Sequence, residues 1–253
     1  MTSGLSAEEI GLIEEAGFAS WPAEEEWRDG GLMVRLSPHL PYQRCTSVNF
    51  TADPPDDLEA GLIRARARFG RAGKELVLRE TPLMPAALRE RLDAEGWGEN
   101  GHTLVMTRAL DAAPAMPENV DIAAAPSPDW LDAYAAFSRA VSHRAIFESV
   151  LRRIVDPASY LGVTDGGRIV AVGVMVRKGD LAGLFGIATE PEYRRRGIGL
   201  AVSQAALAHA AADGAKLAWL QVLASNEPAV ALYRRLGFGT AYDYRYRTLP
   251  GAA

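Results

Sequence analysis

The strongest chemical signal in the sequence is the segment from Thr189 to Leu200, which joins an apolar, strand-like run to an Ala-rich, helix-like run. Its two glycines permit a tight turn that brings backbone N–H groups close to a ligand. The first turn of the helix adds unpaired N–H donors and a partial positive charge. The sequence therefore predicts an anion site, suited to a phosphate or a diphosphate, formed by Arg194, Arg195, Arg196, Gly197, Ile198, Gly199 and Leu200.

Other interpretations of this segment are open or excluded. A basic helix N-terminus that lies in water would have the same composition. A P-loop is excluded because no Gly-Lys-Ser/Thr occurs in the chain, and a dinucleotide fingerprint would need a small residue where Val202 stands. The residues alone therefore predict phosphate binding and leave the ligand open.

A second segment, from Asn226 to Phe238, completes a pattern of two motifs. Together they resemble the GNAT N-acetyltransferase superfamily. Its members carry Arg/Gln-x-x-Gly-x-Gly/Ala where one helix begins, as Arg194 to Gly199 do here. They carry Asn-x-x-Ala-x-x-Leu-Tyr-x-x-x-Gly-Phe over the next helix, as the second segment does. The resemblance covers residues 119–249, and it implies a GNAT fold and transfer of an acetyl group from acetyl-CoA to a primary amine of a small molecule or peptide.

The resemblance also implies roles for individual residues. Backbone N–H groups from Arg195 to Leu200 would bind the diphosphate of acetyl-CoA. Two strands would part, and the exposed edge would pair with the pantetheine arm as an added strand does. The cosubstrate contacts implied beyond the anion site are Ile187, Ala188, Thr189, Asn226, Ala229 and Tyr233. Tyr233 would also be the general acid near the sulfur; packing of its ring with Ala229 and Leu236 is the alternative.

The implied chemistry leaves the general base open. A backbone N–H of Ala188 or Thr189 would stabilise the oxyanion that forms when the amine attacks the thioester. The thiolate that leaves has a pKa of about 8.5, so a tyrosine with a pKa of about 10 can protonate it. Some family members place a glutamate base on the strand before the arginines, but Gly183 occupies that position here. Water, Asp180 or a residue of the N-terminal half remain candidates.

Composition excludes several other classes of protein. Hydrophobic residues make up 48% of the 253 residues, which is typical of globular chains, and no apolar run approaches the roughly 20 residues of a membrane helix. The net charge of −5 argues against nucleic acid as a partner. The single cysteine, Cys45, excludes an intrachain disulfide, and the four scattered histidines favour no metal site: His39, His102, His143 and His209. Because residues 1–17 lack the basic start of a signal peptide, we expect a soluble, cytoplasmic protein with no membrane partner; a homodimer is compatible with the sequence.

The elements that must position these residues follow from periodicity and turn signals. In the C-terminal half the sequence predicts helices after Ser127, around Phe147 to Ile154, over 197–212 and over 228–236. It predicts strands over 120–124, 160–163, 169–176, 181–188, 217–223 and 242–249. Ser142, His143 and Arg144, between the first two helices, are candidates for contacts with the acceptor. This order indicates a mixed α/β (α+β) domain with a mixed central sheet flanked by helices.

The N-terminal half shows weaker patterns. Helices are predicted over 7–16, 58–69 and 85–94, and strands over 32–36, 76–78 and 103–107. Its segment from Pro85 to Trp97 parallels the segment from Pro228 to Phe238, which suggests a duplicated half-domain. The Pro- and Ala-rich stretch from Leu110 to Glu118 is predicted to be a linker. We therefore expect a degenerate, smaller GNAT-like α/β domain at 1–112 that does not bind CoA, and a catalytic GNAT domain at 118–253; a CoA-binding regulatory or scaffold protein without turnover is the alternative.

Overall fold

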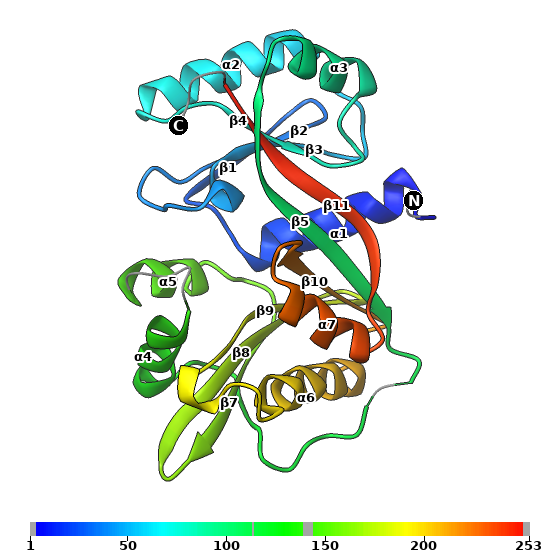
Figure 1. Cartoon of the computed structure of the whole chain (residues 1–253). Helices are drawn as coiled ribbons and strands as arrows, with labels where there is room; N and C mark the ends of the chain where they lie inside the picture. Colours follow the sequence, from blue (N-terminus) through cyan, green and yellow to red (C-terminus); the bar gives the residue numbers. More distant parts are fainter. Residues whose placement is uncertain (1–3, 113, 139–143, 250–253) are drawn as a thin grey trace.

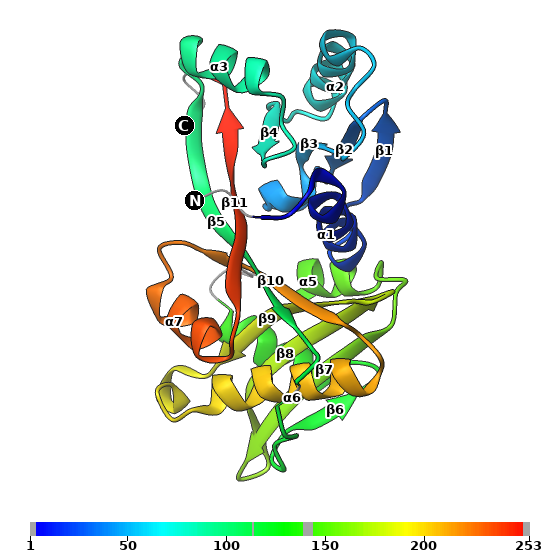
Figure 2. The ribbon, with the colours of Figure 1, turned by 90° about the vertical axis from the view of Figure 1, so that its right-hand side faces the viewer.

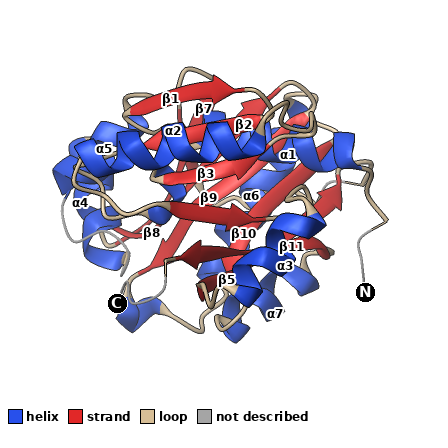
Figure 3. Ribbon diagram, turned by 90° about the horizontal axis from the view of Figure 1, so that it is seen from above, coloured by secondary structure: helices blue, strands red, loops and turns tan. Residues whose placement is uncertain are grey.

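The computed structural model describes residues 4–112, 114–138 and 144–249. Over these residues the chain forms one 11-stranded sheet in the order β1-β2-β3-β4-β11-β5-β10-β9-β8-β7-β6, with helices on both sides of the strands (Figure 3). The strands are β1 (Glu25–Asp29), β2 (Leu32–Leu36), β3 (Ser47–Phe50), β4 (Val77–Glu80), β5 (Gly98–Ala109), β6 (Asp121–Ala123), β7 (Ala158–Asp165), β8 (Arg168–Lys178), β9 (Leu181–Thr189), β10 (Leu217–Leu223) and β11 (Gly239–Thr248). The α-helices are α1 (Ala7–Ser20), α2 (Leu58–Arg71), α3 (Ala86–Ala94), α4 (Pro128–Phe137), α5 (Arg144–Leu151), α6 (Ile198–Ala212) and α7 (Glu227–Arg235), with 3₁₀ turns η1 (Gln43–Cys45) and η2 (Pro191–Tyr193). A mixed sheet flanked by helices is the fold class that the sequence predicts.

The two halves of the chain repeat one order of elements. In the N-terminal half three antiparallel strands, β1 to β3, lead through α2 to β4, which is parallel to β3, and then through α3 to β5. In the C-terminal half β7 to β9 lead through α6 to β10, which is parallel to β9, and then through α7 to β11. The predicted division into domains at 1–112 and 118–253 stays a prediction, because the two repeats share one sheet.

The last strand of each half completes the sheet of the other half. β5 pairs antiparallel with β10, from Leu217 opposite Ala109 to Leu223 opposite Thr103. β11 in turn pairs antiparallel with β4, from Arg245 opposite Glu80 to Thr248 opposite Val77. The two long strands also pair with each other and run side by side between the halves (Figures 1 and 2). Backbone hydrogen bonds of two exchanged strands therefore hold the halves together.

Hydrophobic faces of the elements explain most of the local structure. In the C-terminal sheet Val172, Val174 and Val176 of β8 face α1, α4 and α5, whereas Ala171 and Met175 face α6. The predicted helix start at Ser127 is confirmed, since its side chain accepts a hydrogen bond from Trp130 N at 3.1 Å. Among the described residues no helix combines the length and apolarity that a membrane crossing requires.

Two strands were not predicted. β1 has the sequence EEWRD, whose charged side chains are largely exposed because it is the edge of the sheet. β3 has four residues, all buried, and includes Asn49, whose amide donates to the Met33 carbonyl at 3.1 Å. β1 lacks the alternation on which sequence-based assignment depends, and β3 alternates over only its four residues.

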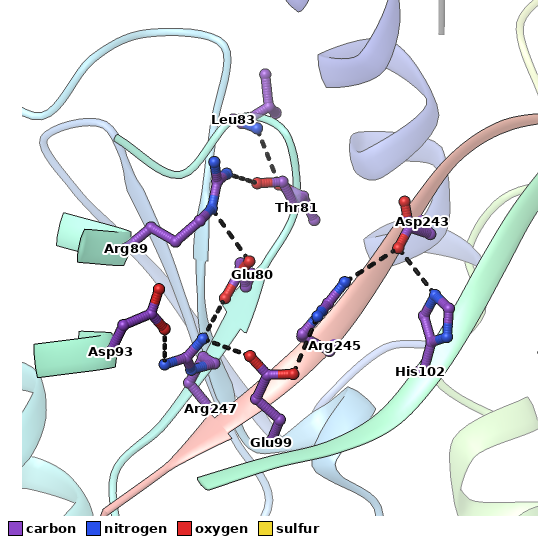
Figure 4. Close-up of polar contacts among 10 residues, drawn as sticks. All are labelled: Glu80, Thr81, Leu83, Arg89, Asp93, Glu99, His102, Asp243, Arg245 and Arg247. Atoms are coloured by element: carbon purple, nitrogen blue, oxygen red, sulfur yellow. Dashed lines mark hydrogen bonds and ion pairs between the residues drawn. The ribbon is translucent and has the colours of Figure 1, made fainter. Parts of the chain in front are cut away.

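A buried arginine fixes the exchanged strand β11 in the N-terminal half (Figure 4). The Arg247 guanidinium donates to Glu80 of β4 at 3.0 Å, to Glu99 of β5 at 2.8 Å and to Asp93 of α3 at 2.6 Å. Its side chain is 2% exposed, whereas Arg245, two residues earlier, is 35% exposed and pairs with Glu99 and Asp243. Arg247 therefore joins carboxylates from three elements, and two of these carboxylates also pair with Arg89 or Arg245.

We predict that Arg247→Met lowers the free energy of unfolding by about 2–3 kcal/mol, because removing one partner of a buried ion pair costs about 3–5 kcal/mol and two of the carboxylates here can still reach water. Arg245→Met, the matched control, should cost less than about 1 kcal/mol because its pairs are exposed. Urea unfolding measures both values. Equal losses in the two variants would contradict the structural role of Arg247.

Candidate active site

The strands β9 and β10 part halfway along their length. They pair in parallel only from Leu181 with Leu217 to Leu184 with Leu220. Beyond that point β9 stays paired with β8, as far as Thr189 opposite Ala171, while β10 stays paired with β5. The parting of two strands, which the family resemblance implied, is thus confirmed.

A bulge in β9 causes the parting. Two residues, Gly186 and Ile187, stand opposite the single residue Gly173 of β8. Gly186 has φ +58°, a conformation that other residues rarely adopt. A Cβ there would also lie 2.4 Å from Cε2 of the Tyr134 ring, so only glycine fits. The bulge turns the end of β9 away from β10.

A cavity of about 600 Å³ lies at the parting. Its walls come from β9, β10, α7 and the N-terminal half. The lining residues are Trp21, Pro41, Tyr42, Gln43, Arg44, Gly101, Thr103, Tyr134, Ser138, Leu184, Phe185, Gly186, Ile187, Gln221, Val222, Leu223, Asn226, Ala229, Tyr233, Tyr244 and Tyr246. Of the residues singled out from the sequence, Ile187, Asn226, Ala229 and Tyr233 line this cavity.

The cavity passes through the plane of the sheet. Leu184 and Ile187 pack with the residues of α6 and α7 on one face. Phe185 points to the other face, where its ring lies 6.0 Å from that of Trp21 and 5.2 Å from that of Trp219. A molecule in the gap can therefore contact groups on both sides of the sheet.

Tyr233 is half-buried and lines the α7 side of the cavity. Its ring packs edge-on against Phe238 at 5.9 Å, so the packing role weighed from the sequence is present. Among the described residues its hydroxyl has no hydrogen-bond partner. Burial raises the pKa of Tyr233 to about 12, so the hydroxyl is neutral and keeps a proton to donate.

Asn226 begins α7 just beyond the end of β10. Its Oδ1 accepts from Ala229 N at 3.4 Å as the helix cap. Within the described part of the chain no acceptor contacts its Nδ2. This amide is thus a donor fixed beside the gap.

The loop before α6 has the features of an anion site. Arg195 has φ +67°, which is rare for a residue other than glycine, and Gly197 has φ +79° as the N-cap of α6. In the described residues no backbone or side-chain acceptor contacts the N–H groups from Arg195 to Leu200. Six consecutive amides are therefore free for a ligand at the start of a 15-residue helix.

The three arginines of the loop differ in their contacts. Arg194 donates from Nε to the Thr189 carbonyl at 3.0 Å and so closes the loop. Arg196 lies with its Cζ 4.9 Å from the centre of the Tyr193 ring. Arg195 and Arg196 have no carboxylate partner among the described residues, which leaves their charge available for phosphate.

The loop and the cavity are neighbours. A Cβ on Gly199 would lie 3.6 Å from Thr189 Oγ1 and 3.7 Å from a Leu232 methyl, so the end of β9, the start of α6 and helix α7 meet there. Ala188, Thr189 and the residues from Arg194 to Leu200 do not line the cavity and lie beyond it at this junction. One long ligand can thus reach both regions.

No base from the protein is evident at the cavity. Gly183 cannot be replaced by a glutamate, because a Cβ there would lie 2.6 Å from the Phe185 ring and 2.8 Å from the Trp219 ring. Asp180 lies at the opposite end of β9, where it pairs with Lys216 at 2.7 Å. The described lining has no carboxylate and no imidazole, and the described residues hold no cluster of metal ligands.

The sequence led us to expect that the N-terminal half covers the acceptor side of the cleft, or an interface, but it did not indicate which of its residues line the cavity. Trp21 and the turn from Tyr42 to Arg44 lie in connections without periodicity, and only the structure brings them to the cavity. Of the residues considered for the acceptor, Ser142 and His143 lie outside the described residues. Arg144 pairs with Asp132 at 2.5 Å and does not line the cavity.

Comparison with known proteins agrees with this geometry. Residues 125–238 match the family model "Acetyltransferase (GNAT) family". The chain is 38% identical over 79 residues to the [ribosomal protein bS18]-alanine N-acetyltransferase of Escherichia coli K12; the match covers 31% of this chain and 53% of that enzyme, so the chain spans about half the length of these relatives. It is also 25% identical, over 95% of its length and 98% of the relative, to the uncharacterized N-acetyltransferase YobR of Bacillus subtilis.

The fold of the whole chain has a solved counterpart. A tandem GNAT protein from the clavulanic acid biosynthesis pathway superimposes with a TM-score of 0.68 at 14% identity, over 97% of this chain and 89% of that one. The repeated order of elements described above is thus a known arrangement of the fold. The C-terminal half of the chain, with the two motifs on either side of the parted strands, is thus similar to the GNAT acetyltransferase family.

Proposed function

We propose that the protein is an N-acetyltransferase that transfers the acetyl group of acetyl-CoA to a primary amine, with Tyr233 as the general acid. The observation that carries the proposal is the cavity at the parted strands, which is lined by Tyr233 and lies next to the loop before α6 with its free amides. The proposal includes no metal.

The site fits acetyl-CoA in three places. The amides from Arg195 to Leu200, with the charges of Arg195 and Arg196, suit the diphosphate. The edge of β9 that faces the gap, from Ile187 to Thr189, suits the amide groups of the pantetheine arm. Asn226 Nδ2 adds one donor at the end of β10.

The reaction proposed is direct attack. The C–N bond to the neutral amine forms, the attacking nitrogen loses one proton to water, the C–S bond of the thioester breaks, and the sulfur leaves as a thiolate. The N–H group of Glu190, the next residue, donates to the Val170 carbonyl of β8 at 2.9 Å. Because backbone N–H groups alternate in direction along a strand, the N–H group of Thr189 points away from β8 and toward the gap. We therefore favour the Thr189 N–H over that of Ala188 as the donor to the oxyanion.

The pKa of Tyr233 defines what this hydroxyl can do. At about 12 it lies above the pKa of about 8.5 expected for the thiol, so complete proton transfer from tyrosine to thiolate is uphill. Donation of a hydrogen bond to the sulfur as charge develops is favourable, and the thiolate then takes its proton as it meets water.

The N-terminal half is proposed to form the wall of the cavity on the side of the acceptor and not to bind CoA. Helix α2 stands where α6 stands in the C-terminal half, but the loop before it carries Asp53, Asp56 and Asp57 instead of arginines. Asp57 Oδ1 accepts from Ala60 N at 3.0 Å and so caps the helix itself. Three carboxylates there oppose binding of a phosphate.

We predict that acetyl-CoA at 100 times its Kd stabilises the protein by about 2.7 kcal/mol, seen as a rise in Tm. Gly199→Asp should weaken this binding about 30-fold, because it adds a carboxylate among the amides while a Cβ there is in ordinary contact distance. Gly70→Asp, on an open face of α2, is the matched control. No shift in Tm at saturating acetyl-CoA would overturn the proposal.

Tyr233→Phe should lower kcat about 100-fold and leave the KM for acetyl-CoA within about twofold, because it removes only the hydrogen bond donated to the sulfur as charge develops. Thiol release over a panel of amines measures both. Tyr160→Phe is the control, since this buried tyrosine packs edge-on against Trp130 and does not line the cavity. Binding of acetyl-CoA without thiol release for any amine would favour the non-catalytic alternative, and unchanged kcat in Tyr233→Phe would remove its role.

The pH dependence of kcat/KM should reflect the pKa of the acceptor amine. Without a base in the described lining, kcat/KM should rise tenfold per pH unit up to the pKa of the free amine, about 10.4 for a lysine-like amine. Tyr233, with a pKa of about 12, stays protonated over that range and causes no fall. An acceptor of lower pKa should move the break downward; a plateau that begins near neutral pH for every amine would show a base in the protein.

A further inference from the structure

The described wall of the cavity has one charged residue, and this residue has no part in the proposed chemistry. Arg44, in the turn η1, is the single residue of the described lining that carries a permanent charge. It contributes to the wall from the N-terminal half, beside Tyr42 and Gln43. A charged group in the wall of a cavity is stabilised by a group of opposite charge.

The protein itself does not supply that counter-charge. Arg35, its buried neighbour, pairs with Glu26 at 2.9 Å, and Arg79 pairs with the buried carboxylate of Glu14. Among the described residues Arg44 has no carboxylate within ion-pair distance. Three guanidinium groups thus share two carboxylates, and the unpaired one is the one that lines the cavity.

Arg44 is held in place by its own backbone and by aromatic rings. Its carbonyl accepts from Arg35 Nη1 at 2.6 Å, and the turn is closed by Cys45 N to Tyr42 O at 2.9 Å. Its guanidinium lies 5.5 Å from the centre of the Trp21 ring. The guanidinium is therefore presented to the cavity by a rigid turn, in a form suited to a planar anion.

Its position is on the acceptor side. Trp21, over which Arg44 lies, stacks toward Phe185, and Phe185 points to the face of the sheet opposite to α6 and α7. The free amides of the loop and Tyr233 lie on the α6 and α7 face. A thioester in the gap would thus lie between Tyr233 and Arg44.

We infer that the acceptor is a small primary amine that also carries a carboxylate and an aromatic or other apolar body, with Arg44 as the group that binds the carboxylate. This inference rests on the proposed function. A guanidinium and a carboxylate form a forked pair of charge-assisted hydrogen bonds. Trp21, Tyr42, Phe185, Tyr244 and Tyr246 supply the apolar walls for the body of the molecule.

The same cavity disfavours an acceptor with a second positive charge. A polyamine would place an ammonium group near Arg44, and no lining carboxylate among the described residues would offset the repulsion.

The experiment compares two ligands that differ only in the carboxylate, N-acetyl-L-phenylalanine and N-(2-phenylethyl)acetamide, by calorimetric titration of the CoA-saturated protein. We expect the carboxylate to bind at least about 10-fold more tightly, since a hydrogen-bonded pair of charges contributes about 1.5–3 kcal/mol. Arg44→Gln should abolish the difference, and Arg44→Lys should restore part of it. Arg71→Gln, an exposed arginine of α2, should leave it unchanged.

The outcomes separate this inference from the proposed function. Failure of CoA to bind would overturn the proposed function. With CoA bound, equal affinity for the two ligands, no binding of either, or a preference that persists in Arg44→Gln would overturn the role of Arg44 and leave acetyl transfer standing. Turnover of L-phenylalanine and 2-phenylethylamine, measured by thiol release, should show the same preference in kcat/KM.

Discussion

The exchange of the final strand between the two halves is the constraint on which the rest of the molecule depends. β5 completes the C-terminal sheet and β11 completes the N-terminal one, so the halves share a continuous ladder of backbone hydrogen bonds. Side chains reinforce the exchange at both ends of the crossing. Arg247 gathers three carboxylates around β11, and Glu14 of α1 accepts from the Tyr242 hydroxyl of β11 at 2.6 Å as well as from Arg79. Separation of the halves would expose these buried charges.

The cavity is a product of the same exchange. A parallel pair of strands can part without loss of stability only if each strand keeps its other neighbour. β10 keeps β5, a strand of the N-terminal half, and β9 keeps β8. The opening created by Gly186 is then covered on one face by α7 and on the other by Trp21 and the turn at Arg44. Under the proposed function, catalytic chemistry and acceptor selection would thus come from different halves of one chain.

The sequence predicts the features that depend on neighbouring residues, and it does not predict those that depend on contacts distant in the chain. Residues 217–223 form an apolar run between turn signals, and β10 has these bounds. Gly197 to Gly199 indicate a helix start by their turn chemistry, and α6 begins there. The final strand was predicted as a strand, but not its partner, because pairing depends on contacts distant in sequence. Arg44 was not singled out as a cavity residue, since nothing local distinguishes it from a surface arginine. Its unpaired state is visible only when Arg35 and Arg79 are seen to use the nearby carboxylates.

The exchanged strands have a consequence for how this chain can be divided. A cut in the stretch between Leu110 and Glu118 would leave one fragment that ends with β5 and another that ends with β11. Each fragment would carry the strand that the other requires and would lack the strand that completes its own sheet. Such pieces would behave as a complementing pair that regains structure on mixing, not as two independently folding modules. The chain is thus suited to split-reporter designs, in which reassembly of the fragments rebuilds the enclosed pocket.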